Sequence, residues 1–153
     1  MSLHQSIERL LEKVEHATIV TVSSNGQRWT TPVYFARHGD TFYWISRHDA
    51  QHSVNVRENA NAFIVIYDSS DGHASASAAY VDAHARELTD EASITAAVDI
   101  IYQRKQAPPP SADRFCEPSA QRVYVAVARA AWTKVVDTSG PSRLEERVEI
   151  ALH

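Results

Sequence analysis

The chain of 153 residues has little cysteine and little glycine. Its single cysteine, Cys116, cannot form a disulfide within the chain, and a metal site made of cysteines alone is excluded. Such sparse cysteine is typical of proteins from a reducing compartment. With only four glycines the sequence has no glycine-rich loop to surround a phosphate, and it has neither a nucleophile elbow nor a Ser-His-Asp order that stands out. These absences argue against P-loop enzymes and serine hydrolases.

Long apolar runs and an excess of positive charge are also missing. No apolar run reaches the roughly 18 residues that a membrane span needs, and the segment from Ser2 to His16 lacks the apolar core of a signal peptide. Fifteen Lys and Arg residues stand against nineteen Asp and Glu residues, which gives a formal net charge of −4. General nucleic-acid binders usually present a basic face. We therefore expect a cytoplasmic protein that binds neither nucleic acid nor membranes.

The composition is otherwise that of an ordinary globular protein, with 44% hydrophobic and 22% charged residues. The length favours one domain over residues 1–153. Within it we expect an N-terminal helix over 1–16 and a peripheral helix over 89–105. A proline-rich linker over 107–120 then leads to the last strands over 121–153.

Two helices are indicated by apolar residues at positions i, i+3, i+4 and i+7. Ser2 and Gln5 resemble a capping box at the start of the first helix, and Thr89 is the expected N-cap of the second. A short helix over 49–59 is also expected, with Asp49 as its N-cap. The apolar positions are Ile7, Leu10, Leu11 and Val14 in the first helix, and Ile94, Ala97, Val98 and Ile101 in the second.

The rest of the chain reads as strands joined by tight turns. Asn25-Gly26 is a strong hairpin signal, and His38-Gly39-Asp40 indicates a second turn. The almost wholly apolar segment 62–67 is expected to be buried on both faces of a sheet. Hairpins dominate and no alternation of strand and helix is visible, which predicts a small antiparallel barrel with peripheral helices. The expected strands are 17–23, 28–36, 41–46, 62–67, 78–88 and 122–136, with a short edge strand over 149–153.

One group of residues is suited to an anion. Ser46 and Arg47 end a predicted strand, and Gln51, His52 and Ser53 begin the short helix that follows. A helix N-terminus with hydroxyl groups and a cation nearby is a natural anion site. The guanidinium of Arg47 has the forked geometry that pairs with a phosphate.

A second group could contact a flat polar ring. The predicted strand that contains Thr30, Thr31 and Pro32 precedes the anion group in the chain. Because Pro32 has no backbone N–H to donate, its strand is expected to carry a bulge or a partly free edge. Free backbone groups beside a bulge are a natural place for a ligand.

These stretches together resemble a known family. Trp29-Thr30-Thr31-Pro32-Val33-Tyr34-Phe35, then Thr41 to Arg47, then His52-Ser53-Val54-Asn55 are similar in order and spacing to the pyridoxamine 5′-phosphate oxidase-like proteins. The likeness extends from Glu8 to Leu88, with Asp68-Ser69 and the segment from Tyr80 to Leu88 also matching the pattern. The resemblance implies a mainly β protein with peripheral helices, folded as an antiparallel split barrel. It also implies a homodimer that binds flavin mononucleotide (FMN) in a groove at its interface.

The resemblance also implies roles for individual residues. Trp29, Thr30, Thr31 and Pro32 would border the isoalloxazine ring and ribityl chain. Ser46 and Arg47 would lie near the ring edge or the phosphate, and Gln51, His52 and Ser53 would approach the phosphate. The chain departs from the oxidases where Gln51-His52 replaces their usual Arg-Lys pair, where Ala78 replaces a ring-contacting Gln, and in the C-terminal basic motif. These departures argue against oxidation of vitamin B6 more than against flavin binding.

The resemblance therefore favours an FMN-dependent oxidoreductase that transfers hydride to or from an unidentified small substrate. The alternatives are a non-catalytic, stress-related protein that binds flavin or haem, and a reductase that uses a deazaflavin coenzyme. A zinc hydrolase is a third, less favoured reading of His48-Asp49-Ala50-Gln51-His52. Asp49 is one methylene shorter than the Glu such enzymes use, and no third ligand is suggested, so we expect no metal.

Overall fold

The computed structural model of the chain describes residues 2–71, 77–137, 139–140 and 144–153. The described residues form one sheet of eight strands, together with three α-helices and two 3₁₀ helices. In chain order the elements are α1 (Leu3–Lys13), β1 (His16–Val22), β2 (Arg28–Tyr34), β3 (Ala36–His38), β4 (Thr41–Arg47), α2 (Gln51–Glu58), β5 (Asn61–Tyr67), the 3₁₀ helix η1 (Ser69–Asp71), β6 (Ala78–Glu87), α3 (Glu91–Lys105), the 3₁₀ helix η2 (Ala112–Phe115), β7 (Gln121–Asp137) and β8 (Leu144–Ile150).

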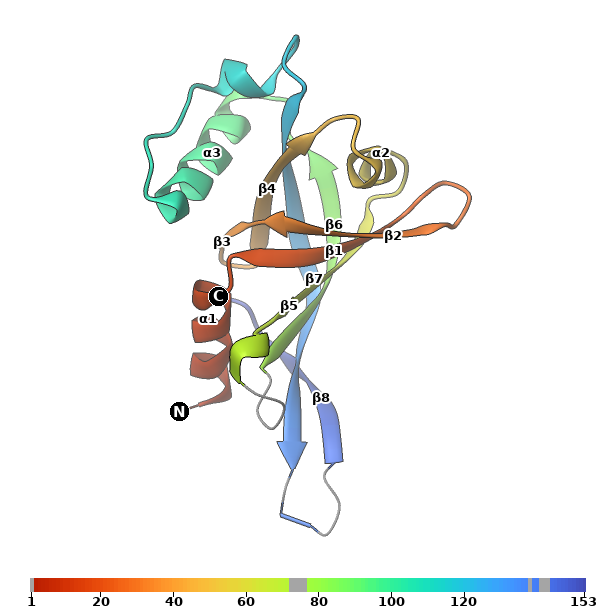
Figure 1. Cartoon of the computed structure of the whole chain (residues 1–153), viewed down its shortest axis with the longest axis vertical. Coiled ribbons are helices and arrows are strands. Elements are labelled where there is room, and N and C mark those ends of the chain that lie inside the picture. Colours follow the sequence, from red (N-terminus) through yellow and green to blue (C-terminus); the bar gives the residue numbers. More distant parts are fainter. Residues whose placement is uncertain (1, 72–76, 138, 141–143) are drawn as a thin grey trace.

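The strands form an antiparallel sheet that curls on itself (Figure 1). Their order is β2-β1-β5-β6-β7-β4-β3, and β8 pairs with the second half of β7. β2, at one end of this order, contacts β4 near the other end. No register of paired residues joins β2 to β4 in the described part of the chain, so the barrel is split on this side. The sequence prediction of a mainly β, antiparallel split barrel with peripheral helices is confirmed.

The main core lies inside the curled sheet, because alternate residues of each strand point inward. In β1, Ala17, Ile19 and Thr21 are buried while the residues between them are half-buried. Trp44 stacks on its cross-strand partner Tyr124, with ring centroids 5.6 Å apart. A second cluster lies under α3 and includes the predicted apolar face of that helix, namely Ile94, Ala97, Val98 and Ile101.

The starts of the two longer helices agree with the sequence prediction in one case and differ in the other. Ser2 and Gln5 form the expected capping box before α1. For α3 the expected N-cap Thr89 is wrong, because Asp90 occupies that position and its carboxylate accepts a hydrogen bond from the backbone N–H of Ser93 at 2.8 Å. A carboxylate at this position also interacts favourably with the helix dipole.

The start of α2 differs as well. Asp49 is not its N-cap; the helix begins after Ala50 and has no side-chain cap. The carboxylate of Asp49 is instead occupied by the guanidinium of Arg47. The backbone N–H groups of the first turn of α2 therefore have no side-chain acceptor.

Two strand predictions and the prediction of the linker need correction. The segment 62–67 is not buried on both faces, because Phe63 and Val65 on the outer face of β5 are only half-buried. The last edge strand is β8, which begins at Leu144 rather than near 149 because it pairs with β7 from Ala131 onward. Part of the linker over 107–120 is ordered as η2, whose Phe115 joins the core under α3.

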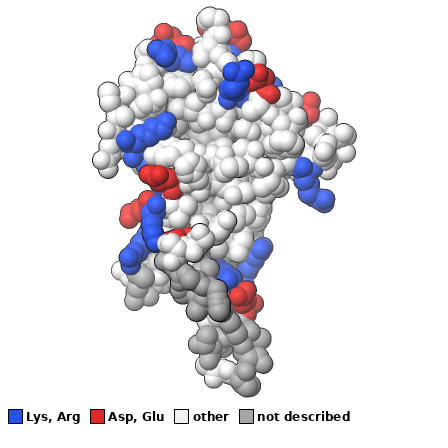
Figure 2. Space-filling model, viewed as in Figure 1, with Lys and Arg blue, Asp and Glu red and all other residues white. Residues whose placement is uncertain are grey.

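The charges on the surface are mixed. On the face that Figure 2 shows, Lys and Arg are scattered among Asp and Glu and do not gather into one basic patch. None of the helices formed by the described residues combines the length and the apolar character that a bilayer crossing requires.

Candidate functional site

A small cavity lies between the β1–β2 hairpin and the first turn of α2. Its volume is about 190 Å³. Trp29 projects into it from β2, and Gln51 lines it from the start of α2. Two residues that the sequence assigned to a cofactor site thus line the same cavity, although they are 22 positions apart (51 − 29). The full lining is Ser23, Ser24, Asn25, Gln27, Trp29, Gln51 and Asn55.

The hairpin is held in place by its own turn and by α2. Gly26 has a φ of +85°, a backbone conformation that glycine adopts at little cost. The backbone N–H of Ser23 donates to the carbonyl of Gln27 at 2.9 Å and closes the turn. The backbone N–H of Ser24 donates to Oε2 of Glu58 at 3.3 Å, which ties the hairpin to the end of α2. A hydrogen bond therefore connects the two walls of the cavity, the β1–β2 hairpin and α2.

Asn55 anchors the helical wall to the sheet. Its Nδ2 donates to Oγ1 of Thr21 on β1 at 3.0 Å, and both side chains are buried. Its Oδ1 accepts a hydrogen bond from Nε2 of Gln51 at 2.8 Å. Loss of these hydrogen bonds would leave the buried amide of Asn55 unsatisfied, which costs stability. The two hydrogen bonds of Asn55 therefore fix the position of Gln51 relative to β1.

The four predicted residues of β2 lie on two faces. Trp29 and Thr31 face the same side as α2, and Nε1 of Trp29 donates to Oγ1 of Thr31 at 3.1 Å. Thr30 and Pro32 alternate with them and lie on the outer face of the sheet, opposite Val20 and Thr18 of β1. The cavity therefore brings together only part of this set.

Arg47 is engaged by its own loop. Its Nε and Nη2 donate to the two carboxylate oxygens of Asp49 at 2.9 and 2.8 Å. Both side chains are more than half exposed. The hydrogen bond between them raises the pKa of Arg47 and lowers that of Asp49. The guanidinium of Arg47 is thus paired with the carboxylate of Asp49, and Arg47 is not part of the lining of the cavity.

His52 and Ser53 point away from solvent. His52 is 7% exposed, and its Nε2 lies 2.8 Å from Oγ of Ser46. Ser53 is fully buried, and its hydroxyl has no hydrogen-bond partner within the described residues. The hydroxyl of Tyr124 is likewise unpartnered; burial raises the pKa of Tyr124 and the nearby Ser53 hydroxyl lowers it. The two hydroxyls thus lie close together, and Ser53 is not part of the lining of the cavity.

Burial lowers the pKa of His52, so its ring is neutral near pH 7. In the unfolded chain the ring has its ordinary pKa of 6.5 and takes up a proton below that pH, whereas the folded chain does not. We expect the free energy of unfolding to decrease as the pH falls below 6.5 until the lowered pKa of the folded state is passed.

This expectation can be tested with His52→Gln, which keeps a hydrogen-bonding group near Ser46 but does not titrate. Urea unfolding at pH 7.5 and at pH 5 is expected to show a larger loss of stability for the wild type than for the variant. Equal losses in the two proteins would contradict it.

Some residues of the cavity were not predicted from sequence. Ser23, Ser24 and Gln27 belong to the hairpin turn, and only the Asn25-Gly26 signal pointed to that turn, without indicating a site. Asn55 belongs to the His-Ser-Val-Asn pattern, but no role was assigned to it. The signal that could have identified it is a buried Asn on a helix next to a strand rich in Thr.

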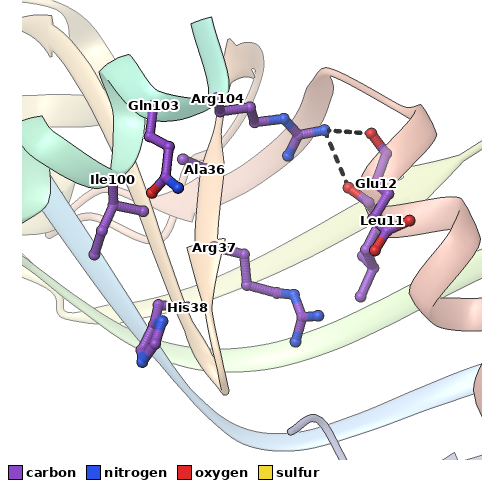
Figure 3. A pocket seen from close by; sticks show the side chains of 8 residues that line it. All are labelled: Leu11, Glu12, Ala36, Arg37, His38, Ile100, Gln103 and Arg104. Carbon is purple, nitrogen blue, oxygen red and sulfur yellow. Dashed lines mark hydrogen bonds between the residues drawn. The ribbon is translucent and has the colours of Figure 1, made fainter. Parts of the chain in front are cut away.

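A second cavity, of about 370 Å³, lies between α1, β3 and α3 (Figure 3). The guanidinium groups of Arg37 and Arg104 both border it. Arg104 is engaged by backbone carbonyls of α1, and Arg37 by the carboxylate of Glu8 and the carbonyl of Gly39. These contacts join the two helices to the barrel, which indicates a structural role.

The described residues contain no group of three His, Cys, Asp or Glu side chains arranged to hold a metal ion. His48 and His52, which have zinc-protease spacing in the sequence, are not on one helix. His48 lies in the loop before α2, whereas His52 is buried in its first turn.

The fold and the cavity define an antiparallel split barrel with a polar cleft between a hairpin and a short helix. The family model described as pyridoxamine 5′-phosphate oxidase matches residues 3–128. The chain therefore belongs to this family, as the sequence resemblance implied. None of the curated proteins matches the sequence.

Solved structures of several differently named proteins share the fold. The heme storage protein HutZ from Vibrio cholerae has a TM-score of 0.70 at 14% identity, over 84% of this chain and 92% of that chain. A protein described as F420 reductase has a TM-score of 0.60 at 16% identity, over 81% and 94%. A heme binding protein from Mycobacterium smegmatis has a TM-score of 0.65 at 14% identity, over 96% and 58%. At these identities the likeness establishes the fold alone.

Proposed function

We propose that this protein is a flavin-binding oxidoreductase whose flavin, FMN, lies against the cavity between the β1–β2 hairpin and α2. The observation that carries the proposal is that Trp29 and Gln51 line one cavity beside the uncapped N-terminus of α2. The indole offers an aromatic surface to a ring, and the free amides and the Gln51 side chain offer hydrogen bonds. When bound, the flavin would supply the hydride chemistry, and the protein would supply position and electrostatics.

The size of the cavity favours a site completed by a second copy of the chain. Ligand pockets usually enclose about 300–1,000 Å³, whereas this cavity has about 190 Å³. A separate surface for a second copy is the outer face of the sheet, on the side of β2 opposite to the cavity. There Phe63 stacks on Trp132 with centroids 6.5 Å apart, and Thr30 and Pro32 lie on the same face. A homodimer formed through this face would bring Thr30 and Pro32 to its interface.

The first test is a titration of the apo protein with FMN, followed by absorbance, together with the mass of the complex in solution. One FMN per chain and a dimeric mass would support the proposal. Bleaching of the bound flavin by a nicotinamide cofactor, and reoxidation by an acceptor, would support turnover. A flavin that binds but cannot be reduced would favour a non-catalytic binding protein instead.

The position of the flavin can be tested with Gln51→Glu. A carboxylate at the start of a helix is compatible with folding, but it would repel an anionic ligand there. We expect FMN affinity to fall about tenfold, which corresponds to roughly 1.4 kcal/mol. Gln103→Glu on α3 is the matched control, since Gln103 lines the other cavity. Equal affinities of the two variants would place the flavin elsewhere.

Haem is the second candidate, because two of the proteins with this fold are named for heme. A Soret band on addition of hemin, with no response to FMN, would favour it. A deazaflavin coenzyme is the third candidate, in line with the F420 reductase that shares the fold. Retention of the deazaflavin in preference to FMN would support that assignment.

A further inference from the structure

The wall of the cavity is electrically neutral. Every residue that lines it carries a hydroxyl, an amide or an indole, and none carries a charge. Gln51 contributes an amide that is already bonded to Asn55. The next residue, His52, is buried and bonded to Ser46. The phosphate of a flavin would therefore meet the backbone amides of α2 but no charged side chain among these groups.

Three arginines belong to α2, to β2 and to the end of the strand that precedes α2, and none of them lines the cavity. Arg57 donates to the carbonyl of His48 at 2.8 Å and lies 3.7 Å from the carboxylate of Glu87. Arg28 is paired with Val22 and lies on the face of β2 that carries Thr30, opposite to the face of Trp29. Arg47 is the third of these arginines and ends β4.

Arg47 is paired with the carboxylate of Asp49, which accepts hydrogen bonds in the same way as a phosphate would. Asp49 accepts from Nε and Nη2 through its two carboxylate oxygens, at 2.9 and 2.8 Å. These are the donors that a guanidinium uses for a forked contact with a phosphate. Because Asp49 is only two residues away, it competes at high local concentration for the same donors. An incoming phosphate would have to displace it, and the displaced carboxylate would remain nearby as a like charge.

We propose that Asp49 makes this a site that selects the ring and ribityl chain of a flavin and gains little from the phosphate, so that riboflavin and FMN bind with similar affinity. This inference rests on the proposed flavin site. It identifies Asp49 as a specificity-determining residue that acts through Arg47. The class of ligand is then an uncharged isoalloxazine with a polyol chain, with or without a terminal phosphate.

The test compares the dissociation constants of riboflavin and FMN on the full chain. In the wild type we expect the two to differ by less than about tenfold. Asp49→Ala frees Arg47, and the preference for FMN is expected to rise by about three- to tenfold while riboflavin affinity stays unchanged. Arg47→Gln combined with Asp49→Ala removes both charges of the pair, so it is expected to abolish the gain and to leave both affinities close to those of the wild type. Asp49 and Arg47 are both exposed, so these variants should fold, which circular dichroism can verify.

Three results would overturn the inference. A wild-type preference for FMN of a hundredfold or more would mean that a cation reaches the phosphate, from Arg47 or from a second copy. A selective loss of FMN affinity in the double variant Arg47→Gln/Asp49→Ala, compared with the wild type, would mean that Arg47 already leaves Asp49 when FMN binds. Binding of neither flavin would overturn the proposed function and this inference together, whereas tight binding of FMN alone overturns only the inference.

Discussion

Replacing Arg104 with alanine is expected to lower the free energy of unfolding by about 2–4 kcal/mol. At the C-terminal end of α1, Nη2 of Arg104 donates to the carbonyls of Leu11 and Glu12 at 3.0 and 3.1 Å (Figure 3). It also donates to the carbonyl of Val14 at 2.7 Å. Its guanidinium carbon also lies 4.5 Å from the ring centroid of Phe35. One side chain of α3 thus satisfies the last carbonyls of α1 and covers an aromatic ring of the core.

The size of this effect follows from what the alanine variant leaves behind. Carbonyls at the end of a helix that lose a charged donor must find water or remain unsatisfied. Burial removes the charge of Arg104 partly from solvent and lowers its pKa. Urea unfolding measures the loss, with Arg104→Met to retain the packing on Phe35. Arg114→Ala, at an exposed arginine of η2, is the matched control. A loss no larger than that of the control would contradict the proposed role.

Replacing Asn55 with alanine is expected to cost about 2–3 kcal/mol of stability and to weaken flavin binding. The variant leaves the buried hydroxyl of Thr21 without its donor and opens a space beneath α2. It also removes the acceptor that holds Gln51 in the wall of the cavity. Stability and binding are therefore expected to fall together, although Asn55 is nearly inaccessible to solvent.

A double-mutant cycle with Thr21→Val separates the two effects. Thr21→Val keeps the size of the side chain and leaves Nδ2 of Asn55 unsatisfied, so each single variant should be destabilised. Because both partners are then absent, the double variant should lose less stability than the sum of the single variants. Strict additivity would show that the hydrogen bond contributes nothing. If Thr21→Val retains flavin affinity and Asn55→Ala does not, the effect on binding comes from the contacts of Asn55 with Gln51 and the cavity rather than from its hydrogen bond to Thr21.

Much of the architecture could be predicted from local sequence. The capping box of Ser2 and Gln5 and the Asn25-Gly26 turn were identified because each depends on residues only a few positions apart. The family resemblance followed from the order of short motifs, and the match over residues 3–128 agrees with it. The predicted caps Asp49 and Thr89 failed because a neighbour competed in each case. The guanidinium of Arg47 binds the carboxylate of Asp49, and Asp90 rather than Thr89 is the N-cap of α3.

The class of fold follows from local sequence patterns, since alternating apolar residues, tight turns and two amphipathic helices leave few ways to build a core. The sequence by itself also drew attention to Trp29 and Gln51. Only the tertiary structure decided which candidates share one cavity, because strand alternation sends Thr30 and Pro32 to the outer face and helix packing buries His52. The pairing of Asn55 with Thr21, which are 34 positions apart, likewise depends on the folded chain, whereas Arg47 and Asp49 pair within one loop. Side-chain partners depend on distances between elements, and those distances are set by packing of the whole chain rather than by any local pattern.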